Sequence, residues 1–377
     1  MKILQVNASY KPAYVYGGPT MSVSKLSEVL VKMGNIVRVF TTTANGSSEL
    51  PVNINEPVLI DGVTVNYFPR ITKDHSHFSP KLLWTMWKQV KQFDVVHIHA
   101  WWNLVSILSC LIAVIRKTPV ILSPRGTLSN YSFHNKNAFI KQCIHSLLGK
   151  PLLNRCFIHV TSTHEAKTIG QLITPRQIIN IPNFIELGKV YNQSDAPKVG
   201  ELQLLFFSRI EEKKGLDILI NSLSKISVPY HLTIAGSGEL DYIAGLKQLS
   251  IQNGVSANIS WIGFQGEKKF NIMSSADLLI LPSYDENFGN VVIESLSVGT
   301  AVLVSEHVGL ADYIIENNFG WICKTDPDSI AGIINNIDKN NLEAIKQRAP
   351  EIIMHDFNED NLAKQYMDMY QQIIHHG

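Results

Sequence analysis

Short apolar runs recur along this chain and alternate with stretches of helical periodicity. The runs lie at residues 3–8, 37–42, 63–68, 95–100, 119–123, 156–161 and 177–181, and again at 202–208, 231–235, 259–262, 278–282, 301–304 and 320–323. Continuous apolar runs of this kind, with helical patterns between them, are typical of strands buried on both faces of a parallel sheet. The pattern therefore predicts an α/β protein with two doubly wound sheets.

A polar stretch separates the two blocks of strands. Residues 191–200 read YNQSDAPKVG, with Pro and Gly between two periodic regions, which is the composition of a linker. We expect an N-terminal domain over 1–190, a linker over 191–200 and a second domain from 201 to 355, with a cleft between the sheets.

A ligand site is predicted where the run 278–282 ends. The loop that follows, SYDENFGNVVIESLSVG, opens into a helix whose start is bracketed by Glu286 and Glu294. Amides in a first helical turn lack partners within the helix and carry its positive end, so a phosphate fits there. Glu286 could accept hydrogen bonds from sugar hydroxyls and Glu294 from a ribose diol, although a bare pair of glutamates more often marks a solvated helix face. The candidate ligand-binding residues of this segment are Glu286, Asn287, Phe288, Gly289, Asn290 and Glu294.

The segment ENFGNVVIESLSVGTAVLVS resembles the EX7E motif of the family 4 retaining glycosyltransferases. The resemblance implies the GT-B fold, in which two Rossmann-like domains face a central cleft. It also implies that the N-terminal domain holds the acceptor and the C-terminal domain the nucleotide sugar. A last helix, within 356–377, is expected to cross back onto the first domain.

Two cations after the run 202–208 resemble the donor-phosphate pair of this family. Arg209 and Lys214 flank the sequence EEKKG, and Gly215 closes the turn. Fixed positive charges there would stabilise the negative charge that builds on a departing diphosphate. Lys213 is equally well explained as a surface cation.

At the other end of the chain, Gly17 and Gly18 precede a helix and resemble the family's Gly-Gly loop, which would contact the diphosphate. Taken alone, the two glycines indicate a flexible turn.

Candidate acceptor residues follow two N-terminal strands. His97 and His99 are two apart on one strand and point to the same side; His99 is nearer the carboxyl end and is favoured for acceptor contact, whereas His97 is expected to be a hydrogen-bonded core residue. After the run 119–123 many family members have a histidine, and this chain has Arg125, within PRGTLS. That sequence resembles a subset of the family. Arg125 either binds an acceptor phosphate or holds its loop.

Two other motifs carry no cofactor prediction. Asp326-Pro327-Asp328 spells DxD, but Asp followed by Pro at a helix start is ordinary capping chemistry, so no metal is assigned. The AGSGE sequence at 235–239 lacks the third glycine of a dinucleotide fingerprint and is not on the first strand. We expect no cofactor beyond the donor itself, a UDP- or GDP-linked sugar.

Charge divides the chain, although its net charge is only +1. Residues 1–198 hold 21 Lys and Arg against 9 Asp and Glu, a balance of +12, and the remainder holds 12 against 23, a balance of −11. A basic half can face anionic lipid, a pyrophosphate-linked acceptor or nucleic acid, and no nucleic-acid motif accompanies it. The segment 82–90, with Trp84 and Trp87, is either an interfacial helix or one packed into the core.

Composition and cysteine usage are ordinary for a globular protein. Of the 377 residues, 45% are hydrophobic and 17% charged, and the four cysteines lack metal or disulfide spacing. The first residues resemble a strand more than a leader, and the apolar stretch 104–115 is too short to cross a bilayer. We expect a cytoplasmic protein, with possible peripheral contact at the inner face of the cell membrane.

The predicted function is a retaining, metal-independent glycosyltransferase of the hexosyltransferase type. It would move a sugar from a nucleotide diphosphate sugar to a hydroxyl of a glycan or lipid-linked acceptor, in surface polysaccharide or lipopolysaccharide synthesis. Retention is implied by the resemblance alone. Glu286, Arg209 and Lys214 are the catalytic candidates, and the leaving diphosphate would itself take the acceptor proton. The alternatives are a GT-B epimerase or phosphorylase, or a non-catalytic protein that binds nucleotide sugars.

Overall fold

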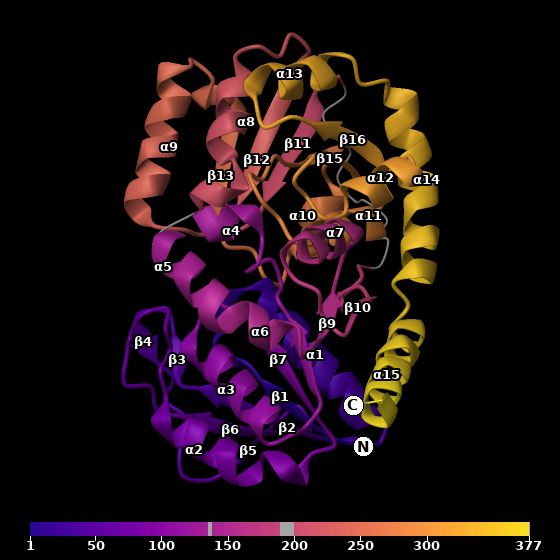
Figure 1. Cartoon of the computed structure of the whole chain (residues 1–377). Coiled ribbons are helices and arrows are strands. Elements are labelled where there is room, and N and C mark those ends of the chain that lie inside the picture. Colours follow the sequence, from indigo (N-terminus) through magenta and orange to yellow (C-terminus); the bar gives the residue numbers. More distant parts are fainter. Residues whose placement is uncertain (135–137, 189–199, 377) are drawn as a thin grey trace. The chain divides into compact units, whose positions relative to one another are not determined.

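The chain folds into two compact units. The structure is a computed structural model that describes residues 1–134, 138–188 and 200–376 (Figure 1). Unit 1 comprises Met1–Phe184 and Glu359–Gly377, and unit 2 comprises Ile185–Asn358. The predicted linker, 191–200, lies outside the described residues except for Gly200.

Unit 1 is built on an eight-stranded sheet with the order β10-β9-β8-β7-β1-β2-β6-β5. Its pairs are parallel except β5 with β6, and its seven longer strands confirm the predicted apolar runs. The sequence analysis did not predict β5 or a short hairpin, β3 with β4. The strands are β1 (Lys2–Val6), β2 (Ile36–Thr42), β3 (Ala44–Asn45), β4 (Ser48–Glu49), β5 (Val58–Ile60), β6 (Val63–Phe68), β7 (Val95–His99), β8 (Val120–Ser123), β9 (Phe157–Val160) and β10 (Gln177–Asn180).

Helices cover both faces of this sheet. Val96 and Ile98 of β7 belong to a core cluster with α2 and α3, whereas Val95 belongs to one with α1 and α15. Alternation along β7 therefore turns His97 and His99 toward α15. The helices are α1 (Gly18–Lys32), α2 (Pro80–Gln89), α3 (Leu104–Ile115), α4 (Asn130–His134), α5 (Ala138–Ile144), α6 (Lys150–Leu153), α7 (Thr163–Leu172) and α15 (Glu359–His376), with the short 3-10 helices η1 (Tyr14–Tyr16) and η2 (Val90–Gln92) and the π-helix η3 (His145–Gly149).

The C-terminal helix α15 belongs to unit 1, although it follows unit 2 in the chain. It packs beside α1, as Figure 1 shows in yellow and indigo. Leu362, Tyr366, Tyr370 and Ile373 are buried in the cluster that holds β1 and α1, and their spacing is that of one helix face. Two of these residues, Tyr366 and Tyr370, bring hydroxyl groups into the core.

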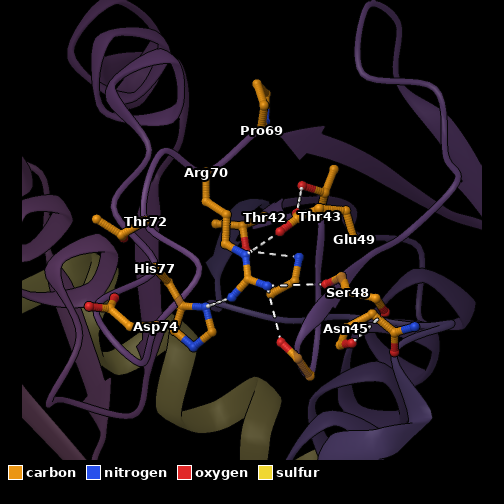
Figure 2. Close-up of polar contacts among 12 residues, drawn as sticks. Thr42, Thr43, Asn45, Ser48, Glu49, Pro69, Arg70, Thr72, Asp74 and His77 are labelled. Atoms are coloured by element: carbon orange, nitrogen blue, oxygen red, sulfur yellow. Dashed lines mark hydrogen bonds and ion pairs between the residues drawn. The ribbon is translucent and has the colours of Figure 1, made fainter.

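A buried arginine fastens the β3–β4 hairpin to the end of β6. Arg70 donates from Nε to Glu49 (2.7 Å), from Nη2 to the Gly46 and Ser48 carbonyls (3.1 Å each), and from Nη1 to Nδ1 of His77 (3.3 Å). Figure 2 shows these groups converging on the guanidinium. The hairpin in turn contacts the loop before α1, because the Gly46 amide donates to the Tyr16 hydroxyl (3.1 Å). This clamp supports the loop that carries Gly17.

Unit 2 is built on a parallel six-stranded sheet with the order β13-β12-β11-β14-β15-β16, as predicted from the apolar runs. The chain runs outward from β11 to β13, then returns to β14 on the other side of β11. The strands are β11 (Leu202–Phe207), β12 (Tyr230–Ala235), β13 (Ile259–Gly263), β14 (Leu278–Leu281), β15 (Ala301–Ser305) and β16 (Gly320–Cys323). The helices are η4 (Glu212–Lys214), α8 (Leu216–Leu223), α9 (Leu240–Gln252), η5 (Ser256–Asn258), α10 (Lys269–Ser274), α11 (Asn290–Ser297), α12 (Ala311–Glu316), α13 (Pro327–Asn335) and α14 (Lys339–Asp356).

Strand order reverses between β11 and β14, and the carboxyl ends of the strands at such a reversal are the position where open α/β sheets bind ligands. Among the helices in the described ranges, none is long and apolar enough to cross a membrane.

Candidate active site

The reversal point of the unit 2 sheet brings together the three residues predicted as catalytic. Arg209 and Lys214 follow β11, and Glu286 follows β14. Lys214 Nζ forms an ion pair with Glu286 Oε2, although the two residues are 72 positions apart. Both side chains are largely buried.

A glycine allows the Lys214 turn to approach β14 this closely. Gly215 has a φ of +69°, and a Cβ atom there would overlap the carbonyl oxygen of Pro282, which follows β14. A backbone hydrogen bond also holds the Lys214 turn to the loop after β14, because the Tyr284 amide donates to the Lys213 carbonyl (2.9 Å). Gly215 is therefore required for the contact between Lys214 and Glu286.

A second ion pair lies beside the first. Lys213 Nζ is 2.7 Å from Asp285 Oδ2, so consecutive lysines on one loop meet consecutive acids on the other. Burial raises the pKa of Glu286, but Lys214, with smaller contributions from Lys213 and Arg209, outweighs it and leaves the pKa below its ordinary value. Glu286 is therefore a carboxylate at neutral pH.

Arg209 is the most exposed of the predicted trio. Its side chain is 45% exposed and its guanidinium pairs with Glu211. A guanidinium held on the rim of the site by a single exposed carboxylate can exchange that partner for an anionic ligand at small cost.

Glu294 lies on α11 and pairs with a lysine that the sequence analysis did not identify. Lys269 Nζ, from α10, is 3.0 Å from Glu294 Oε1 and 3.4 Å from Glu186 Oε2. Burial, with a smaller contribution from the charge of Glu186, raises the pKa of Glu294 despite the opposing effect of Lys269. Nothing in the local sequence marks Lys269, because its partner is 25 residues away.

The turn before α11 has the form of an anion site. Gly289 is the N-cap, with a φ of +91°, and no side chain caps the helix there. Phe288 is buried in the core and anchors the turn, while Glu286 is fixed by its own backbone, which exchanges hydrogen bonds with His307 (3.0 Å) and Gly309 (2.8 Å). The first turn of α11 contains Asn290 and no acidic residue.

In unit 1, Gly17 and Gly18 open α1. Gly17 is the N-cap with a φ of +63°, and its amide donates to the Tyr14 carbonyl (2.9 Å). Gly18 is exposed. The N-terminus of α1 therefore presents backbone without side chains at this turn, which is held by the Arg70 clamp described above.

The acceptor candidates of unit 1 belong to a buried chain of hydrogen bonds. His97, predicted as a hydrogen-bonded core residue, is fully buried between Tyr370 (Nδ1 to hydroxyl, 2.6 Å) and Ser123 (Nε2 to Oγ, 2.6 Å), which confirms that prediction. The chain continues from Ser123 to His159 Nδ1 (2.6 Å) and from His159 Nε2 to the Ile181 carbonyl (2.9 Å).

His99 lies at the other end of the same chain. It is 1% exposed, and its ring centroid is 4.2 Å from that of His97, so the two rings share a side as predicted. Arg125 Nε donates to His99 Nδ1 (3.2 Å), His99 Nε2 meets Gln5 Oε1 (2.7 Å), and Gln5 Nε2 donates to the Tyr370 hydroxyl (3.0 Å). Both ring nitrogens of His99 are thus used within the protein.

The donor-to-acceptor direction of this hydrogen-bond chain is fixed at both ends. Arg125 can only donate, so His99 Nδ1 accepts and its proton is on Nε2; at the other end the Ile181 carbonyl can only accept, so His159 also carries its proton on Nε2. Every link between them then has one donor and one acceptor, with Tyr370 donating to His97. All three histidines are neutral, and burial is the largest cause that lowers their pKa values, to about 3 for His159.

Two motifs of the sequence analysis have structural roles. Asp326 caps α13, accepting from the Ser329 amide (2.8 Å), and Pro327 occupies the first turn, which confirms the capping prediction. Gly236 and Gly238 let the turn after β12 lie against the turn after β11, because a Cβ at either would overlap a backbone carbonyl, that of Ser208 or Ile210.

Two family models match adjacent parts of the chain. The Glycosyltransferase Family 4 model matches residues 16–189, and the model for Glycosyl transferases group 1 matches residues 190–351. The chain belongs to glycosyltransferase family 4. The EX7E resemblance is thus confirmed, and the predicted GT-B fold of this glycosyltransferase agrees with its two parallel-sheet units.

Relatives of this glycosyltransferase extend over almost its whole length. An uncharacterized glycosyltransferase of Methanocaldococcus jannaschii is 29% identical, over 98% of each chain. The structure of Anabaena HepE in complex with UDP-glucose matches 99% of this chain and 100% of that one, with a TM-score of 0.77 and 19% identity. WaaG, a glycosyltransferase involved in lipopolysaccharide biosynthesis, matches 98% and 99%, with a TM-score of 0.70 and 15% identity.

Proposed function

We propose that this glycosyltransferase transfers a hexose from a nucleotide diphosphate sugar, with retention and without a metal ion, to a hydroxyl of a glycan or lipid-linked acceptor. The donor would bind unit 2 and the acceptor unit 1, in keeping with the predicted domains 1–190 and 201–355 and the returning helix 356–377. UDP is the favoured nucleotide, because Anabaena HepE is described in complex with UDP-glucose. A role in surface polysaccharide synthesis is favoured by the likeness to WaaG.

One observation carries the proposal: the Lys214–Glu286 pair at the reversal point of the unit 2 sheet, beside Arg209 and the uncapped start of α11. Lys214, Arg209 and the α11 amides supply positive charge where a diphosphate would leave. Glu286 supplies a carboxylate that can accept from sugar hydroxyls. Glycosyl transfer from a nucleoside diphosphate sugar requires groups of these two kinds.

Donor binding would exchange partners within the site. The diphosphate would replace Glu286 on Lys214 and Glu211 on Arg209, which frees the Glu286 carboxylate to accept from the sugar. Glu294 would accept from the ribose. As the bond from the anomeric carbon to the diphosphate breaks, its electron pair stays on the diphosphate oxygen, which the two cations stabilise. The acceptor oxygen bonds to the same face of the anomeric carbon, and its proton passes to that diphosphate oxygen.

The first test is thermal unfolding with UDP, GDP, ADP or CMP, each with and without magnesium. Stabilisation by one diphosphate, unchanged by magnesium, supports a metal-independent donor site. Stabilisation by UDP that disappears without magnesium contradicts the metal-independent part of the proposal.

The second test is Glu286→Gln, which keeps the shape and removes the charge. We expect turnover of UDP-glucose, measured as UDP release, to fall by roughly a hundredfold. The matched control is Glu316→Gln, at an exposed glutamate of α12. A folded Glu286→Gln enzyme with the turnover of the control would refute the catalytic assignment.

We further propose that unit 1 contacts an anionic membrane surface. α2 buries Leu82 and Met86 but exposes Trp84 (59%) and Trp87 (44%). Lys88 Nζ lies 3.6 Å from the Trp84 ring centroid, so aromatic and cationic groups share the outward face. This exposure agrees with the interfacial interpretation of the segment 82–90.

A second exposed stripe strengthens this proposal. Phe139, Ile140, Ile144 and Leu147 of α5 and η3 recur at helical spacing, and Phe139 and Leu147 are 78% and 82% exposed. The stripe lies within residues 95–164, which contain no acidic residue. Apolar and basic groups together fit an anionic lipid surface.

Vesicle flotation tests membrane contact. The wild-type chain should float with vesicles of phosphatidylcholine and phosphatidylserine more than with phosphatidylcholine alone, because the anionic lipid attracts the basic unit. The double variant Trp84→Ala, Trp87→Ala should lose much of this binding, whereas Leu59→Ala, at an exposed residue of β5, should not. Equal flotation with both lipids would contradict the proposal.

A further inference from the structure

Arg125 is a charged group whose hydrogen-bond partners are all neutral. It is half-buried, and its Nε and Nη1 donate to His99 (3.2 Å) and to Asn183 Oδ1 (2.7 Å). Within residues 1–134, 138–188 and 200–376, no carboxylate forms an ion pair with it. Withdrawing a cation from water without a counterion costs free energy, so Arg125 would gain by binding an anion.

The nearest candidate counterion is committed elsewhere. Glu165 accepts from the Gly126 amide (2.9 Å) through Oε1 and from the Thr161 amide (3.0 Å) through Oε2, so its carboxylate holds the loop after β8 to the start of α7. Residues 95–164 themselves contain no acidic residue. Glu165 therefore acts on Arg125 only through space and forms no ion pair with it.

Nη2, the remaining donor nitrogen of Arg125, has a fixed orientation. Nη2 has no hydrogen-bond partner in the part of the chain that the structure describes, and the residue is only half-buried. His99 and Asn183 fix the other two nitrogens and thereby the plane of the guanidinium. The backbone of Arg125 is also left-handed, with a φ of +52°, a conformation that side chains with a Cβ adopt rarely.

The hydrogen-bond chain behind His99 makes this arrangement rigid. His99 can accept from Arg125 only while its Nε2 proton points at Gln5, and Gln5 is oriented by Tyr370 of α15. Every residue in this hydrogen-bond chain is neutral, so the chain orients the guanidinium of Arg125 without neutralising its charge. His99 is thus a positioning residue, which acts on a ligand through Arg125 and not by contact.

We propose that the free edge of Arg125 binds a phosphate group of the acceptor, so that this glycosyltransferase acts on phosphate-bearing acceptors. This inference rests on the proposed function, because it takes unit 1 as the acceptor side. A guanidinium nitrogen donating to a phosphate oxygen forms a charge-assisted hydrogen bond, and the phosphate supplies the counterion that Arg125 lacks.

The test follows the His99 ring in the full chain by nitrogen NMR after 15N-histidine labelling, during a titration with inorganic phosphate. The His99 signals are identified by their absence from a His99→Gln variant. Because Arg125 Nε donates to His99 Nδ1, phosphate bound at Nη2 should shift the Nδ1 resonance in a saturable way. Sodium acetate at the same ionic strength should have a smaller effect.

Two variants make the result decisive. Arg125→Gln should weaken the phosphate response of the His99 ring by roughly tenfold or more. Arg155→Gln removes one exposed cation from the same unit and should leave the response unchanged. Absence of a His99 shift, an equal response in Arg125→Gln, or an equal effect of acetate would each overturn the proposal.

The result of the phosphate titration can be distinguished from the result of the UDP-binding test of the proposed function. UDP binding is measured by thermal unfolding and depends on Arg209 and Lys214 in unit 2, whereas the histidine signals report unit 1. A phosphate response without UDP binding would leave the Arg125 site standing and refute the donor site, and UDP binding without a phosphate response would do the opposite.

Discussion

Acid should selectively destabilise unit 1 through its buried histidines. Burial, together with the charge of Arg125, lowers the pKa of His159 to about 3, from an ordinary value of 6.5. As pH falls below 6.5 the unfolded chain binds a proton at this residue, and the folded unit does not until about pH 3. The stabilisation is therefore complete above pH 6.5 and is lost progressively as pH falls toward 3.

The magnitude follows from linkage. One histidine with these two pKa values lowers the free energy of unfolding by about 3 kcal/mol between pH 7.5 and 4.5. His97 and His99 are lowered in the same direction, mainly by burial, and add to the loss. Protonating any of the three also breaks a link in the one-way chain, because each ring has one acceptor nitrogen and that nitrogen is occupied.

The assay is native-state hydrogen exchange of the peptide that contains β9, measured from pH 7.5 to 4.5 and corrected for the intrinsic rate. His159→Gln removes the titrating group, so it should lose about 3 kcal/mol less over this interval than the wild type. His164→Gln, at an exposed position of α7, is the control and should follow the wild type. Identical pH dependence in wild type and His159→Gln would refute the reasoning.

Two further predictions concern unit 2. Lys269→Ala leaves the Glu294 carboxylate without its partner and should cost about 2 kcal/mol in urea unfolding, and adding Glu294→Gln should restore part of it. If the double variant were no more stable than Lys269→Ala, the pair would not be the cause. Gly215→Ala places a Cβ against Pro282 in a left-handed turn and should weaken UDP binding, whereas Gly332→Ala, with open space inside α13, should leave binding unchanged and add about 0.5 kcal/mol of stability. Equal UDP affinity in the two glycine variants would contradict the role of Gly215.

Regular elements followed from the sequence because their signals are local. Strands buried on both faces need continuous apolar residues, and Asp326 caps a helix through an amide three positions away, so both could be predicted. β5 and the β3–β4 hairpin were missed because these strands are only two or three residues long, and those of the hairpin are also partly polar. Their placement depends on β6 and on Arg70, which lies 21 residues from Glu49.

The candidate site divides in the same way. Resemblance to family motifs pointed to Glu286, Arg209 and Lys214, because each belongs to a strand–turn–helix segment that can be compared locally. Their pairing, the contribution of Lys269 and the enclosure of His99 were decided by tertiary structure. Long-range partners leave no local pattern, because only folding brings them together. Tyr370 meets His97 across 273 residues, and His99, which the sequence favoured for acceptor contact, is buried with both ring nitrogens bonded to Gln5 and Arg125.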